Sequence, residues 1–167
     1  MPAIEINVVH VERWSLKASI SFETILARVE REIGHPDMRV FWQRAAAAKT
    51  LADLEGVLKD AIGPAGLMEF VRFDHGGILR KSPEAKAGQL LRLVIGNPQI
   101  MREMAKHVPD AGSYAPVTVL LDEREDGVYL SYDRMASLLA PYGNPEALQV
   151  ARDLDSKIEA LLTRAAS

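Results

Sequence analysis

The sequence has no cysteine, which excludes disulfide bonds, thiol nucleophiles and metal sites with cysteine ligands. It also has no apolar run of membrane-spanning length, and no basic segment followed by an apolar stretch near its start. We therefore predict neither a transmembrane helix nor a signal peptide. We expect a cytoplasmic protein that does not act at a membrane.

The sequence also lacks a large excess of either positive or negative charge. The 20 basic and 23 acidic residues give a formal net charge of -3, and the basic residues form no stripe or long cluster. Nucleic-acid-binding domains usually carry a basic excess or a basic face. The sequence therefore gives no reason to expect a nucleic acid as partner.

What is present is the composition of an ordinary globular chain. Of the 167 residues, 48% are hydrophobic and 26% are charged, which supplies enough apolar material for a core. No internal repeat, linker or low-complexity segment divides the sequence. We therefore expect one domain over residues 1–167.

Five segments have the alternation or the β-branched and aromatic content of strands. The first is predicted over residues 4–13, where Ile4, Ile6 and Val8 alternate with polar residues. The last two are separated by residues 122–127, a polar stretch ending in Asp-Gly that indicates a hairpin. The strands after the first are predicted over residues 67–73, 89–95, 117–121 and 128–132.

Helices are predicted where a capping residue precedes apolar residues at helical spacing. Ser21, Asp37 and Thr50 begin three successive helices, Asn97 begins a fourth that runs to about residue 108, and a short helix lies near residues 137–142. Strands and helices in this order predict an α+β fold. We expect a mainly antiparallel sheet of about five strands, covered on one face by helices in a two-layer sandwich.

The last helix is predicted from Pro145 to about residue 166, with Asn144 as its N-cap. An apolar residue recurs every three or four positions along it, which makes one continuous seam. The seam could pack on the chain's own sheet or on a second copy, and the sequence leaves both open. Its residues are Ala147, Ala151, Leu154, Ile158, Leu161 and Ala165.

Several short segments carry a resemblance to a known family. They are Phe73-Asp74-His75-Gly76, Val94-Ile95-Gly96-Asn97-Pro98, Met104, Tyr114-Ala115-Pro116 with residues 117–121, Tyr132-Asp133-Arg134 with Ser137-Leu138, and residues 150–157. In order and spacing they resemble the bacterial and archaeal family called domain of unknown function 302, over about residues 50–165. Met135-Ala136 departs from the Pro-Ser that relatives more often carry. The resemblance implies a small α+β fold, a homodimer and no established activity.

His75 is the first candidate site residue. It follows a predicted strand and precedes Gly76 and Gly77, so it could serve as a base or ligand near neutral pH while the glycines let a ligand approach the backbone. Alternatively, His75 fills a loop and Asp74 caps a turn. Neighbouring residues on a strand point to opposite faces, so Asp74 need not touch His75.

The triplet Gly96-Asn97-Pro98 is the second candidate. Free N–H groups at a helix start attract phosphate or carboxylate groups, and Gly96 permits close approach. Capping alone also accounts for the triplet, because Asn97 suits the N-cap and Pro98 suits the first turn.

Tyr132 is a third candidate, as a helper of His75 in acid–base chemistry. Met101 and Met104 fall on one helical face and could ligate haem or copper together with His75. Methionine is also an ordinary core residue, so we predict no metal and no cofactor.

Three functions stay open. The first, which we expect because no catalytic motif such as Gly-x-Ser-x-Gly is present, is a non-catalytic homodimeric module that binds a small ligand or anion. Its candidate binding residues are His75, Gly76, Gly96, Asn97 and Tyr132. The second is a small enzyme with His75 as general base, and the third is a protein-interaction domain.

Overall fold

The computed structural model describes residues 2, 4, 6, 8–84 and 88–167 of the chain. Its centre is a five-stranded sheet with the spatial order β1-β5-β4-β3-β2. Each neighbouring pair of strands is antiparallel. The strands are β1 (Arg13–Ala18), β2 (Met68–Asp74), β3 (Leu90–Gly96), β4 (Val117–Arg124) and β5 (Gly127–Asp133).

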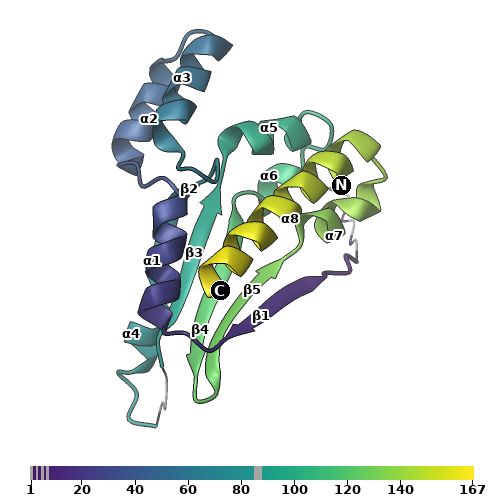
Figure 1. The fold of residues 1–167 in the computed structure, drawn as a ribbon. Helices are drawn as coiled ribbons and strands as arrows, with labels where there is room; N and C mark the ends of the chain where they lie inside the picture. Colours follow the sequence, from purple (N-terminus) through teal and green to yellow (C-terminus); the bar gives the residue numbers. More distant parts are fainter. Residues whose placement is uncertain (1, 3, 5, 7, 85–87) are drawn as a thin grey trace.

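Helices cover one face of this sheet (Figure 1). Val117, Val119 and Leu121 of β4 are buried beneath them, whereas Thr118 and Leu120 on the opposite face stay partly exposed. The predicted α+β sandwich is confirmed. The helices are α1 (Phe22–Glu32), α2 (Met38–Ala47), α3 (Leu51–Ala61), α4 (His75–Leu79), α5 (Pro98–Ala105), α6 (Ala111–Tyr114), α7 (Met135–Leu139), the 3-10 helix η1 (Ala140–Tyr142) and α8 (Pro145–Ala166).

The predicted first strand is wrong in position. The strand begins at Arg13, whereas Ile4 and Ile6 are 88% and 87% exposed; residues 5 and 7 of the predicted range lie outside the described residues. The reason is the pairing partner. Arg13 lies opposite Asp133, the last residue of β5, so the described residues before Arg13 lie beyond the end of the strand that could pair with them.

The capping residues in the sequence predicted the starts of α1 and α3 correctly. Ser21 accepts a hydrogen bond from the backbone N–H of Thr24 at 3.2 Å. Thr50 and Asp53 form the predicted capping box, with each side chain accepting from the backbone N–H of the other. The structure adds the short helices α4 and α6, and α5 ends at Ala105, three residues before the predicted end near residue 108.

Two apolar cores hold the fold together. The main core lies between the sheet and the covering helices, and the seam of α8 is buried there, so that seam packs within the chain. The second core joins the α2–α3 hairpin to β2 through Phe41, Leu58 and Met68. In Figure 1 this hairpin stands at one end of the sheet, beside α5.

Candidate functional site

The candidate residues named from the sequence lie in three separate places. Asp74, just before His75, pairs with Leu91 near the start of β3, whereas Gly96 ends the same strand. At about 3.3 Å per residue, His75 and Asn97 are therefore roughly 20 Å apart, at opposite ends of the sheet. Tyr132 is elsewhere again, buried in β5 under the helices.

His75 begins the short helix α4, with Asp74 as its N-cap. The Asp74 carboxylate accepts a hydrogen bond from the backbone N–H of Gly77 at 2.7 Å, so it is directed at the helix. The imidazole of His75 stacks on Phe73, with ring centroids 6.0 Å apart and ring planes 6° apart. Asp74 is thus the cap that one sequence interpretation expected, and its hydrogen bond goes to Gly77.

Gly76 is required by packing within the chain. A Cβ atom at this position would lie 2.7 Å from the backbone nitrogen of Leu90 and 2.8 Å from Nη1 of Arg80. The close approach that favours glycine here is therefore made by the chain's own atoms.

Gly96 and Asn97 line an apolar cavity of about 200 Å³ at the start of α5. The Asn97 carbonyl oxygen accepts from the backbone N–H of Gln99, and its amide donates to the carbonyl of Gly66, both at 2.9 Å. Because both ends of this side chain are bound to the protein, Asn97 offers little to an anion. The apolar lining includes Phe70, Ile100, Met101, Met104, Val117 and Leu154.

A second cavity of about 470 Å³ adjoins the first, between the α2–α3 hairpin and α5. Both are lined by Trp42, Pro98 and Met101, so we describe them as the inner and outer parts of one apolar cleft. The remaining lining residues of the outer part are Phe41, Ala45, Ala46, Leu51, Leu54, Glu55, Leu58, Gln99 and Arg102.

Trp42 is the most prominent side chain of the apolar cleft. It is 54% exposed, although tryptophan is one of the largest apolar side chains. Its ring centroid lies 4.9 Å from that of Phe41 and 6.3 Å from that of Phe70. Since Phe41 belongs to the second core, the core that anchors the hairpin also holds Trp42 at the border of the two cavity parts.

Tyr132 belongs to a buried polar cluster instead. Its hydroxyl donates to Asp155 of α8, which is only 4% exposed. Asp155 also accepts the backbone N–H groups of Met135 at 2.7 Å and Ala136 at 3.0 Å. One carboxylate thus joins β5, α7 and α8.

Burial raises the pKa of Asp155 to about 6. The two backbone N–H donors act in the opposite direction, and the nearby carboxylates Glu159 and Glu12 add to the increase. A buried carboxyl with a raised pKa is a common property of active sites. Here, however, the carboxylate oxygens already accept hydrogen bonds from the protein, so the cluster is explained by its role in joining three elements.

Sequence reasoning missed Trp42 and Phe70, and it named Asp155 only within a matching family segment. Trp42 and Phe70 gave no local signal, because the apolar cleft forms only when the hairpin packs beside α5. Asp155 had a usable signal. It follows Leu154 directly and lies four residues after Ala151, so it borders the apolar seam of α8. This position on the helix predicts that its side chain is at least partly buried.

The described part of the chain holds neither a metal-binding cluster of side chains nor a membrane-spanning helix. Among the described residues, no group of three or more histidine, aspartate or glutamate side chains could hold a metal ion. None of the helices in the described ranges is both long and apolar enough to span a membrane.

Comparison with known proteins places the chain in a family. The model of the family described as domain of unknown function DUF302 matches residues 44–165. This chain belongs to the DUF302 family. The crystal structure of an uncharacterized conserved DUF302 protein from Bacillus stearothermophilus is similar, with a TM-score of 0.63 and 13% sequence identity. The similarity covers 92% of this chain and 97% of the other.

Membership in the DUF302 family confirms the resemblance seen in the sequence and explains the fold. At 13% identity the structural similarity extends to the fold alone. No curated protein matched the sequence. The DUF302 match begins at residue 44, so it includes most of the apolar cleft but neither Phe41 nor Trp42.

Proposed function

We propose that this DUF302 chain is a non-catalytic module that binds a small, mainly apolar molecule in the apolar cleft. The observation that carries the proposal is the cleft itself, in which a half-exposed Trp42 borders two adjoining cavities lined mostly by apolar side chains. Ligand sites of proteins are typically concave and apolar, with a few polar groups and a volume of roughly 300–1,000 Å³. The outer part, at about 470 Å³, lies within this range.

The proposal keeps part of the binding site expected from the sequence. Gly96 and Asn97 line the inner part of the cleft, and we propose that they contribute to binding by shaping its wall and not by attracting an anion. His75, Gly76 and Tyr132 line neither part of the cleft, so the proposed site does not include them. An anion is also less suitable than an apolar ligand, because the backbone N–H of Gln99 already donates to Asn97 and Pro98 at the first helical position has no N–H.

Tryptophan fluorescence tests the proposal directly. The chain has two tryptophans, so the variant Trp14→Phe leaves Trp42 as the single reporter. Titration with 1-octanol should change the emission of Trp42 in a saturable way and raise the melting temperature, because a ligand that binds only the folded state stabilises it.

A matched pair of variants locates the site. Met101→Lys places a charge in the cleft, where Met101 lines both parts, and should abolish the saturable response. Val40→Lys places the same charge on exposed α2 surface and should leave the response unchanged. Equal responses in the two variants, or no saturation in the Trp14→Phe parent, would refute binding in the cleft.

We also propose that the chain forms a homodimer and acts in the cytoplasm, as the sequence suggested. The uncovered face of the sheet supports the dimer, since Val71 and Phe73 of the edge strand β2 are each 41% exposed. A second copy packed on this face would bury both side chains. Sedimentation at micromolar concentration tests the dimer, and a monomer there would contradict it.

A further inference from the structure

The polarity of the apolar cleft changes along its length. None of the described residues that line the inner part is charged, and the polar side chain of Asn97 is bound at both ends to the protein. The outer part is also lined by Glu55 of α3 and Arg102 of α5. The cleft is therefore apolar toward the sheet and carries charged groups toward its outer end.

Glu55 and Arg102 carry charges of opposite sign, and their contacts with other residues leave both charges able to act on a ligand. Nη1 of Arg102 lies 3.5 Å from Oε1 of Glu103, but Lys106 engages Glu103 more closely. The hydrogen bond from Lys106 is the main cause that lowers the pKa of Glu103. Within the described part of the chain, Glu55 makes no ion pair closer than 4.0 Å, and the Arg102 side chain is 44% exposed.

We propose that the ligand is a single-chain amphiphile whose apolar tail enters the inner part and whose neutral or zwitterionic head group lies beside Glu55 and Arg102. This inference rests on the proposed function of the cleft. A head group with one net charge would be attracted by one of the two side chains and repelled by the other. A zwitterionic or hydrogen-bonding neutral head group meets a favourable partner without that repulsion.

Three eight-carbon probes separate the contributions of tail and head: 1,2-octanediol, octanoate and octylammonium. Their dissociation constants are measured by Trp42 emission in the Trp14→Phe background. We expect all three to bind through the same tail, with the diol at least as tight as either ion. The charged residues are then neutralised one at a time, as Glu55→Gln and Arg102→Gln.

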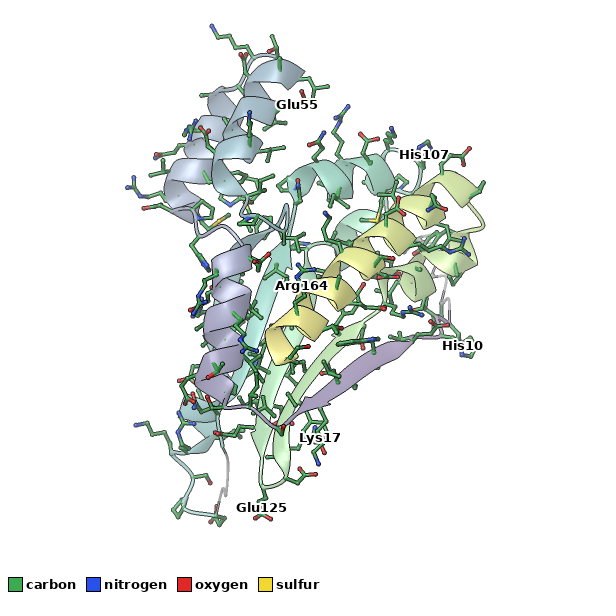
Figure 2. The ribbon with its side chains drawn as sticks, in the orientation of Figure 1. His10, Lys17, Glu55, His107, Glu125 and Arg164 are labelled. Carbon is green, nitrogen blue, oxygen red and sulfur yellow. The ribbon has the colours of Figure 1, made fainter. Side chains whose placement is uncertain are left out.

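Each substitution should change the dissociation constants of octanoate and octylammonium in opposite directions. Glu55→Gln should tighten octanoate and weaken octylammonium by about two- to fivefold, as expected for solvent-screened charges. Arg102→Gln should do the reverse, and each substitution should change the binding of the diol less than that of either ion, because glutamine can still hydrogen-bond to a hydroxyl. Glu125→Gln, at the hairpin tip on the opposite end of the molecule from Glu55 (Figure 2), removes the same charge and should change no constant.

The outcomes distinguish this inference from the proposed function. If none of the probes binds, both fail. A second outcome is that the diol binds while Glu55→Gln and Arg102→Gln leave the dissociation constants of both ions unchanged. In that case the cleft remains a binding site, but the proposed position of the head group is wrong. Both substitutions are at exposed or partly exposed positions, and circular dichroism checks that the variants stay folded.

Discussion

Asp155 gives the sharpest prediction about stability, because its carboxyl is buried and its pKa is raised by that burial. The pKa increases from 3.8 to about 6 in the folded chain. A difference of one pKa unit corresponds to 1.36 kcal/mol, so the full effect is about 3 kcal/mol. The perturbation is to change the pH through this window, with and without the carboxyl.

The sign follows from which state binds the proton more tightly. Between about pH 4 and pH 6 the folded chain keeps the Asp155 proton while the unfolded chain has lost it. Rising pH therefore lowers the contribution of Asp155 to stability, opposite to the usual effect of a carboxylate paired in the folded state. The loss between pH 5 and pH 7.5 should be about 1.4 kcal/mol, and above that range it is complete.

Urea denaturation of the parent and of Asp155→Asn at several pH values measures this contribution. Other carboxylates titrate as well, but their effects cancel in the difference between the two proteins. The unfolding free energy of the parent should fall relative to that of Asp155→Asn as the pH rises. Asp153→Asn, on the exposed side of α8, is the control for the loss of a charge. Parallel pH profiles for the parent and Asp155→Asn would refute the reasoning.

Three further substitutions test the same description. Tyr132→Phe removes a hydroxyl that donates to the buried Asp155 and should lower the unfolding free energy by about 1.5–3 kcal/mol in urea denaturation; an unchanged value would contradict a role in the cluster. Leu154→Ala should cost about 2–5 kcal/mol and enlarge the inner part of the cleft, so that 1-decanol gains affinity relative to 1-octanol. Asn144→Ala removes the cap of α8, whose oxygen accepts from the N–H of Ala147 at 2.8 Å, and should cost about 1 kcal/mol by thermal denaturation.

The parts of the fold that follow from neighbouring residues could be predicted from the sequence. The Thr50–Asp53 capping box and the Asn97 and Asn144 caps each depend on residues within three positions of one another. The hairpin between β4 and β5 likewise follows from one short polar loop. The seam of α8 was also evident, although only the packed chain shows that it lies on its own sheet.

The first strand shows why local alternation was insufficient. Ile4, Ile6 and Val8 alternate as a strand should, yet a strand also needs a partner, and β5 supplies one only from Arg13 onward. The same limit applies to the apolar cleft. Trp42 and Met101 are far apart in the sequence, and only the packing of the α2–α3 hairpin makes them line one cavity.

The residues behind the family resemblance mostly have structural tasks in this chain. Asn97 caps α5, Asp74 caps α4, and Tyr132 and Asp155, from two matching segments, meet in one buried cluster that joins β5, α7 and α8. The family model thus matches a framework in which these motif residues have structural roles, whereas others from the matching segments, such as Met104 and Pro116, line the inner part of the cleft.

The proposed binding surface is divided differently. Gly96, Met101 and Leu154 lie within the matched residues 44–165, whereas Phe41 and Trp42 of α2 precede them. One wall of the cleft therefore belongs to the framework and the other comes partly from outside the match. If the cleft is the site, changes in α2 should alter which ligand binds while leaving the framework intact. Exchanging Trp42 for Leu should accordingly shift the order of affinities among apolar ligands, with little loss of stability because Trp42 is already half exposed.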